Sequence, residues 1–164
     1  MTVAATGDPN VISLEHRRAT RQLAQKLSKC LKAGDLVILD GQLGSGKTFL
    51  VRALCRALGL PERVRVTSPT FSLLHEIGTT PRITHADLYR LSKARDLLEL
   101  GLVERREDGD LLLVEWGMPY VEELGGDALI LEFAHDPRRV HVRATGERSG
   151  RILTMLHQLH HSDS

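Results

Sequence analysis

Near residue 40 the chain reads LVILDGQLGSGKTFL, an apolar run followed by three glycines, a lysine and a threonine. Gly41, Gly46, Lys47 and Thr48 match the pattern GxxxxGK[ST], which arises by chance in on the order of half a per cent of chains this long. A buried strand before the loop and a helix of about 12 residues after it form the frame that this motif requires. The stretch therefore predicts strand, phosphate-binding loop and helix in succession.

The residue types in this loop suit a polyphosphate. Glycines let successive N–H groups point inward, and the start of the helix adds the positive end of its dipole. Lys47 supplies a mobile charge for the β- and γ-phosphates, and the Thr48 hydroxyl is placed to bind Mg²⁺. We expect the nucleotide to be bound by Gly41, Leu43, Gly44, Ser45, Gly46, Lys47, Thr48 and Phe49. The dinucleotide pattern GxGxxG is absent.

Apolar periodicity predicts the remaining elements. Leu23, Leu27, Cys30 and Leu31 have helical spacing, so a helix is expected from Ser13 to the AGD stop at residues 33–35. Residues 36–40 and 111–116 are continuous apolar runs, typical of strands that are covered on both faces. RVRV, TFSLLHEI and RITHADLY also indicate strands, and SKARDLLELGL indicates a helix. ERREDGD, residues 104–110, is expected to be a surface turn.

The C-terminal third predicts two more strands, ALILEF and RRVHVRA, paired as a hairpin across AHDPR, and then a short amphipathic helix. Strands interleaved with helices indicate an α/β, P-loop NTPase-like fold. Its mainly parallel central sheet would carry helices on both faces and antiparallel strands toward the C-terminus. We expect a flexible segment at residues 1–10, one P-loop ATPase domain at 11–146, and a polar tail at 147–164.

Composition places few further limits on function. With 22 basic and 21 acidic residues, the net charge of +1 does not by itself indicate a nucleic-acid or membrane partner. Cys30 and Cys55 lie in apolar helical patterns and are expected to be buried rather than paired. No apolar run approaches a membrane span of about 18 residues, and the first ten residues lack the features of a secretory signal. These observations favour a cytoplasmic protein.

A phosphate-binding loop leaves several classes of protein open. The guanine-recognition pattern NKxD is absent, and the chain is short for a motor, so an ATPase, a small-molecule kinase and a non-hydrolysing binding module remain. Three downstream segments narrow the choice: VTSPTFSLLHE at 66–76, HADLYRL at 85–91 and LLLVEW at 111–116. Their order behind the loop resembles the TsaE (YjeE) family over roughly residues 13–143. The loop differs from the family's usual GDLGAGKT at Gln42 and Ser45, and GMPY replaces the Pro-Glu that often follows the tryptophan.

The resemblance and the sequence positions together assign roles to four residues outside the loop. Glu115 ends an apolar strand, where an acid holds Mg²⁺ through water or orients the attacking water. Asp87 is expected to be a Mg²⁺ ligand, with helix capping as the alternative. Thr70 in SPTF is expected to sense the γ-phosphate, with an ordinary turn threonine, or Thr67 or Ser68 in the same role, as the alternatives. Trp116 either packs in the core or contacts adenine. His75 and His85 are expected to pack or to support neighbouring site residues.

The resemblance also implies a function. TsaE proteins are small bacterial ATPases needed for the threonylcarbamoyl modification of adenosine 37 in tRNA. The expected reaction is Mg²⁺-dependent ATP hydrolysis, weak without partners, with Lys47, Glu115 and Thr70 as catalytic residues. The expected partners are the TsaD and TsaB subunits, which transfer the group themselves and are reset by this protein. Any contact with tRNA would be indirect.

Overall fold

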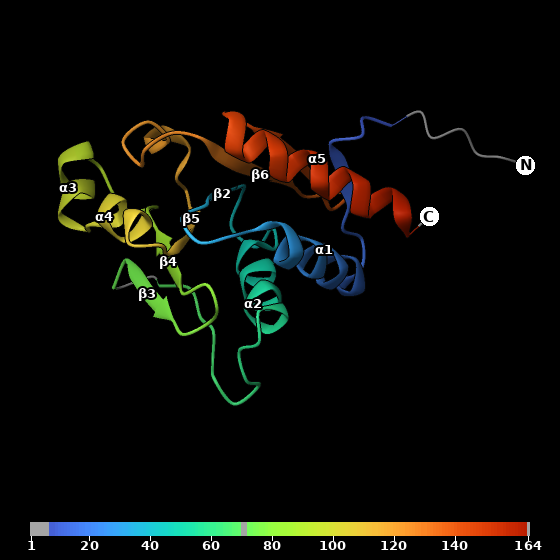
Figure 1. The fold of residues 1–164 in the computed structure, drawn as a ribbon, viewed down its shortest axis with the longest axis horizontal. Coiled ribbons are helices and arrows are strands. Elements are labelled where there is room, and N and C mark those ends of the chain that lie inside the picture. The colour runs from blue at the N-terminus through green and yellow to red at the C-terminus, as the bar shows by residue number, and fades with distance from the viewer. Residues whose placement is uncertain (1–6, 70–71, 164) are drawn as a thin grey trace, which may run out of the picture.

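The computed structural model describes residues 7–69 and 72–163, which form one seven-stranded sheet with helices on both faces (Figure 1). The strands are β1 (Val11–Ser13), β2 (Leu36–Asp40), β3 (Leu74–Ile77), β4 (Ile83–Asp87), β5 (Leu111–Glu115), β6 (Ala128–Ala134) and β7 (Arg139–Ala144). The α-helices are α1 (Arg17–Cys30), α2 (Lys47–Ala57), α3 (Ala94–Glu99), α4 (Leu102–Glu107) and α5 (Glu147–Ser162), and residues Met118–Tyr120 form a 3₁₀ turn.

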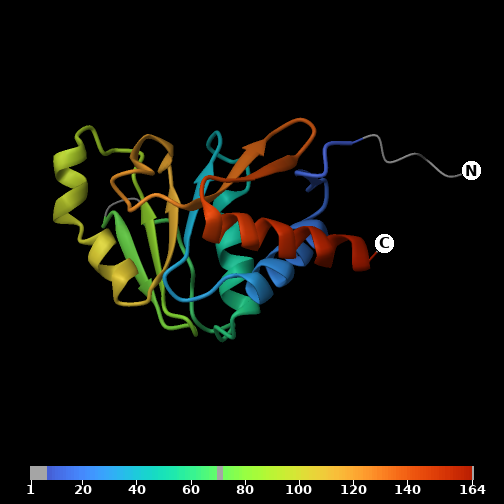
Figure 2. The same cartoon turned by 45° about the horizontal axis from the view of Figure 1, so that its top comes forward.

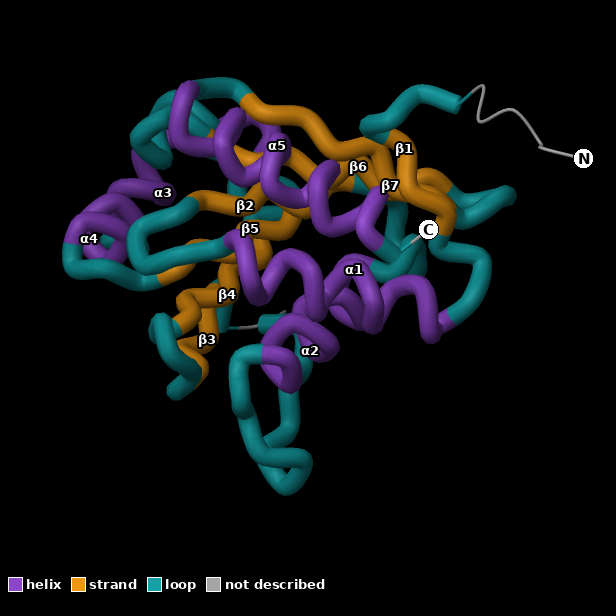
Figure 3. The backbone as a smooth tube through the Cα atoms, turned by 45° about the vertical axis from the view of Figure 1, so that its right-hand side comes forward, coloured by secondary structure: helices purple, strands orange, loops and turns teal. Residues whose placement is uncertain are grey.

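The strands follow one another in the order β1-β7-β6-β2-β5-β4-β3 (Figure 3). The four strands at the centre, β6, β2, β5 and β4, are parallel, whereas β7 and β1 at one edge and β3 at the other pair antiparallel. The predicted α/β class and the β6–β7 hairpin are therefore confirmed. The parallel strands β2, β4 and β5 end at the same edge of the sheet, so the residues that follow them are brought together there.

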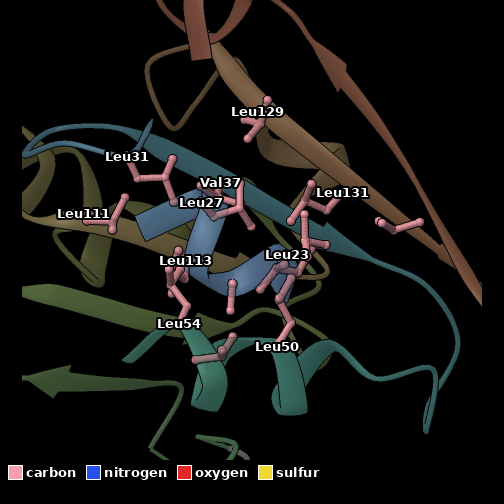
Figure 4. Packing of buried hydrophobic residues seen from close by; sticks show 14 of the residues in the cluster. Leu23, Leu27, Leu31, Val37, Leu50, Leu54, Leu111, Leu113, Leu129 and Leu131 are labelled. Atoms are coloured by element: carbon pink, nitrogen blue, oxygen red, sulfur yellow. The ribbon is translucent and has the colours of Figure 1, made fainter. Parts of the chain in front are cut away.

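Alternate side chains of the central strands enter two separate cores, as period-2 geometry requires. Val37 and Leu39 face α1, α2 and α5, while Leu36 and Ile38 face α3, α4 and the segment around Leu124. Figure 2 shows the two groups of helices on opposite sides of the strands. Figure 4 shows the first core, where the leucines of α1 and α2 gather against the strands. The expectation of helices on both faces is confirmed.

Two assignments made from the sequence need correction. The helix begins at Arg17 and not at Ser13, because residues 11–13 pair antiparallel with β7. RVRV at 63–66 is not a strand, because the Arg56 guanidinium binds the carbonyls of Pro61 and Val64 in a loop. The first difference arises from a contact with a distant strand, and the second from a side chain of the preceding helix. The buried positions predicted for α1 and the burial of both free cysteines are confirmed.

The predicted turn at residues 104–110 is also wrong, since residues 104–107 belong to α4. The predicted helix SKARDLLELGL is observed as α3, and Gly101, at φ 65°, separates it from α4. Arg106 on α4 reaches across the end of the sheet, and its guanidinium donates to the carbonyls of Gly34, Leu124, Gly126 and Asp127 at 2.8–3.2 Å. Burial lowers the pKa of Arg106. This side chain therefore ties α4 to two loops that are distant from it in the sequence.

Replacing Arg106 with alanine is expected to lower the free energy of unfolding by about 2–4 kcal/mol, because it leaves several half-buried carbonyls without donors. Urea denaturation would measure the change. Arg105→Ala is the matched control, because among the described residues the side chain of the neighbouring Arg105 makes a single ion pair, with the exposed Glu76. Arg105→Ala is expected to lower the free energy of unfolding by less than about 1 kcal/mol. Equal effects of the two substitutions would contradict the role given to Arg106.

The C-terminal segment forms the expected helix, and it has 16 residues. Ile152 and Leu156 are buried in the first core, so one face of α5 packs on the sheet beside α1. Asp127 accepts hydrogen bonds from the backbone N–H groups of Arg148 and Ser149 at the start of the helix. None of the helices in the described part of the chain is long and apolar enough to cross a membrane.

Candidate nucleotide site

The glycine loop connects the end of β2 to the start of α2. Gly41, Gly44 and Gly46 have φ values of 143°, 76° and 109°, which side chains other than glycine rarely adopt. α2 begins at Lys47, so its first N–H groups face the loop, where an anion is favoured. The Ser45 hydroxyl is buried and has no hydrogen-bond partner among the described residues. The loop therefore places the N-terminus of α2 beside a buried hydroxyl, that of Ser45, which has no partner among the described residues.

Gly41 is the glycine of this loop with the least space around it. A Cβ there would lie 2.8 Å from the Phe133 carbonyl oxygen and 2.9 Å from the Ser45 hydroxyl, while one at Gly44 would meet nothing within 4 Å. We expect Gly41→Ala to lower the free energy of unfolding by about 2 kcal/mol or more, from both clash and backbone strain. Gly44→Ala, which adds only strain, is expected to cost about 1 kcal/mol. Urea denaturation of the pair tests this, and an equal cost would contradict it.

Lys47 is buried, with 5% of its surface exposed, and its ammonium group lies beside the loop. It donates to the carbonyl oxygens of Gly41 and Gln42, and its Nζ lies 4.2 Å from the centre of the Trp116 ring. Burial lowers the pKa of Lys47, and the nearby carboxylates of Glu115, Asp40 and Asp87 oppose that effect. A buried cation is strongly stabilised by an anionic partner, because the attraction between opposite charges is stronger away from water.

Glu115 and Asp87 end the adjacent parallel strands β5 and β4 and are directly opposite each other in the register. The Glu115 carboxylate is almost completely buried. One oxygen, Oε1, accepts from the Thr48 hydroxyl at 3.3 Å, and the other, Oε2, lies 2.9 Å from His85 Nε2. Asp87 accepts from the Ser68 hydroxyl at 3.3 Å and from the Tyr89 backbone N–H at 3.0 Å. Thr48, Glu115 and Asp87 thus place hard oxygen donors side by side, the ligand type that Mg²⁺ prefers.

Trp116 follows Glu115 at φ 61°, a conformation that is uncommon for a bulky residue. Its backbone N–H donates to the Leu39 carbonyl at 3.1 Å, and its ring lies 4.9 Å from the Tyr89 ring, centre to centre. The side chain is half-buried. The turn therefore directs the indole over Lys47 and the loop, where it is not fully enclosed by the core.

These groups border one cavity of about 640 Å³, a volume within the range of small-molecule sites. It is lined by Leu14, Arg17, Thr20, Leu43, Gly44, Ser45, Gly46, Lys47, Thr48, Phe49, Ser68, Asp87, Tyr89, Arg90, Glu115, Trp116, Phe133 and Arg138. Gly41 lies behind the loop, against Phe133. The structure therefore brings together the residues predicted from sequence, except Thr70, which lies outside the described residues.

Comparison with known proteins gives the family. The family model described as "Threonylcarbamoyl adenosine biosynthesis protein TsaE" matches residues 14–144. The chain belongs to the TsaE family. A tRNA threonylcarbamoyladenosine biosynthesis protein TsaE from Streptomyces coelicolor is 41% identical over 138 residues, which cover 78% of this chain and 92% of that protein.

Other relatives match this TsaE family member over shorter or more divergent stretches. The TsaE protein of Rickettsia felis is 39% identical over 107 residues, which are 65% of this chain and 61% of the Rickettsia protein. Among solved structures, YdiB of Bacillus subtilis has a TM-score of 0.71. That match covers 94% of this chain and 95% of YdiB at 24% identity, so it supports the fold alone.

The cavity of this TsaE family member includes residues that sequence reasoning did not place in the site. Arg17 and Phe133 are the clearest cases: Arg17 lies 5.7 Å from the centre of the Phe49 ring, and Phe133 lies against Gly41. Arg138 also lines the cavity, and nothing in the sequence distinguishes it from the other arginines. No local pattern indicates these three, because Arg17 starts α1 and the other two flank the β6–β7 turn. The pairing of β6 with β2 brings that turn beside the loop.

Proposed function

We propose that this protein is a Mg²⁺-dependent ATPase that serves tRNA threonylcarbamoyladenosine biosynthesis. Its membership of the TsaE family, whose matching relatives are named for that pathway, supports the biosynthetic role. The observation that carries the ATPase proposal is the meeting of Lys47, Thr48 and Glu115 at the border of one cavity. A strand-end acid beside a GxxxxGK[ST] loop is the arrangement in which P-loop proteins bind and hydrolyse nucleoside triphosphates.

The loop would bind the phosphates through its N–H groups and through Lys47. The ammonium group now bonded to the carbonyls of Gly41 and Gln42 would turn to the β- and γ-phosphates. Leu43, which is largely exposed at the rim of the cavity, and Phe49 and Trp116 offer apolar surface for the nucleoside. Contact of Trp116 with adenine is part of this proposal.

Thr48, Asp87 and Glu115 would hold the metal, and their three oxygen-bearing side chains fit Mg²⁺ in donor type. When bound, Mg²⁺ offsets the negative charge of the phosphate oxygens. Glu115 would also orient the attacking water, for which its second oxygen is fixed by His85. Thr70, in the SPTF segment, is proposed to sense the γ-phosphate and to change position on hydrolysis.

We further propose that the protein acts on a TsaD–TsaB complex and resets it between catalytic cycles, without transferring the threonylcarbamoyl group itself. A cytoplasmic location follows from this role. Partners would detect the state of the Thr70 segment, which borders the cavity through Ser68. On this proposal, isolated ATPase activity is weak and partners stimulate it.

The small-molecule kinase is the less supported alternative. Its lid would need free arginines, and ERRED at 104–108 is the candidate in the sequence. In the structure Arg105 pairs with Glu76, and Arg106 binds four backbone carbonyls. Both arginines are therefore occupied at the opposite end of the sheet from the glycine loop.

The test is a phosphate-release assay with purified protein, ATP and Mg²⁺, with and without the TsaD–TsaB pair, alongside counting of modified tRNA per complex. We expect stimulated phosphate release and many rounds of modification, both lost when EDTA removes the metal. Phosphate retained on an added small acceptor would favour the kinase. ATP binding without partner-stimulated phosphate release would favour the binding module. Many rounds of modification without this protein would overturn the proposed role.

A further inference from the structure

His85 is a completely buried histidine in the middle of β4, on the same face of the strand as Ile83 and Asp87. Its Nε2 lies 2.9 Å from Glu115 Oε2 on the neighbouring strand. An ionised carboxylate can only accept hydrogen bonds, so Nε2 must carry the hydrogen. Nδ1 is buried and has no partner among the described residues. All of the polar bonding of this side chain that the structure describes is thus directed at Glu115.

Glu115 needs a partner of this kind. The last torsion of a glutamate is broad and roughly two-fold, so rotamer preference does not fix the plane of its carboxylate. Two donors on different oxygens do fix it: Thr48 on Oε1 and His85 on Oε2. In the proposed function the Thr48 oxygen also serves the metal, whereas His85 bonds to no other site group that the structure describes. His85 is therefore the donor dedicated to Glu115.

Thr84, the preceding residue, provides a contrast within the same strand. It is equally buried, faces the opposite side of the sheet, and donates to Asp110 at 2.7 Å. Asp110 also receives a bond from Arg82 and lies before β5, away from the cavity. A buried polar pair that only stabilises the sheet is thus already present in β4. His85 differs because its partner ends β5 and lines the cavity.

We propose that His85 is a positioning residue, which holds the carboxylate of Glu115 in the orientation needed for the metal and the attacking water. This inference rests on the proposed function. In this role His85 acts by orienting Glu115 and does not itself contact the nucleotide. Loss of such a supporting hydrogen bond typically lowers metal affinity or activity by about 10- to 100-fold.

The test compares His85→Leu, which removes the donor and keeps an apolar side chain, with His85→Gln, whose amide N–H can reach Glu115. Thr84→Val is the matched control for losing a buried hydrogen bond in β4. For each protein, Mn²⁺ binding in the presence of ADP is measured by electron paramagnetic resonance. ADP binding without metal and the urea midpoint are measured in parallel.

We expect His85→Leu to weaken Mn²⁺ binding by about 10-fold or more, with metal-free ADP affinity unchanged. His85→Gln should restore most of the loss, and Thr84→Val should bind Mn²⁺ like the wild type. If His85→Leu does not fold, His85→Asn replaces it, because its amide is one carbon shorter than that of glutamine.

Wild-type Mn²⁺ affinity in His85→Leu would overturn the inference while leaving the proposed function intact. The inference would fail equally if His85→Gln bound Mn²⁺ as poorly as the leucine or asparagine variant, or if Thr84→Val showed an equal loss. A wild-type protein that binds no Mn²⁺ with ADP would instead overturn the proposed function, and the inference with it.

Discussion

Lys47→Ala is expected to weaken ATP binding by about 10- to 150-fold, because it removes a charge-assisted contact worth about 1.5–3 kcal/mol. Partner-stimulated phosphate release should fall by a further factor of about 10²–10³, since charge on the transferred phosphate would lose its stabilising cation. Lys47 is buried between the loop carbonyls and Trp116. Isothermal titration calorimetry and a phosphate-release assay measure the two effects.

Lys29→Ala is the control for the loss of one lysine. Lys29 lies in the last turn of α1 and is exposed, away from the cavity. This variant should bind ATP like the wild type. If Lys47→Ala also bound ATP within about twofold of the wild type, a change of less than about 0.5 kcal/mol, the loop would not be the phosphate site. Unchanged urea midpoints in both variants would separate the binding effect from unfolding.

Glu115→Gln is expected to give the second large effect, with a different signature. The amide keeps the volume of the side chain and can still accept a bond from His85, so the fold and metal-free nucleotide binding should persist. Phosphate release should fall by about 10²–10³, because the group proposed to orient water and to hold the metal would lose its charge. The variant should therefore hold ATP without hydrolysing it, as equilibrium binding and single-turnover measurements would reveal.

Glu132→Gln provides the matched control. Glu132 lies in the parallel strand β6, which β2 separates from β5. A hydrogen bond from Arg143 lowers the pKa of its carboxyl group, and the side chain does not line the cavity. Phosphate release by Glu132→Gln should stay close to that of the wild type. Normal hydrolysis by Glu115→Gln would show that another residue activates the water, and equal losses in both variants would point to damage of the sheet.

The glycine loop and its frame were predictable because their signals are local. The continuous apolar run of β2, the helical spacing of Leu50 and Leu54, and the GKT sequence all lie within about 20 residues. The predictions of a helix beginning at Ser13 and of a strand at residues 63–66 were wrong. β1 owes its existence to β7, more than 120 residues away, and residues 63–66 follow the reach of Arg56 instead of their own β propensity.

The same distinction applies to the candidate site. Lys47, Thr48, Asp87, Glu115 and Trp116 were predicted from motif and strand-end position, and all line one cavity. Arg17, Phe133 and Arg138 were not predicted to do so, because no motif marks them and only the strand order places them there. The role of Thr70 stays a prediction from the SPTF segment.

The sequence by itself determined the family, the α/β class and the frame of the glycine loop between β2 and α2, since each depends on neighbouring residues or on motifs in a fixed order. Only the tertiary structure decided which side chains meet. Thr48 and Glu115 are 67 residues apart, and His85 and Glu115 are 30 apart, yet both pairs are within hydrogen-bond reach. The reason is physical: parallel strands align their ends at one edge of the sheet, and the pairing of β4 with β5 is a long-range contact that no local pattern encodes.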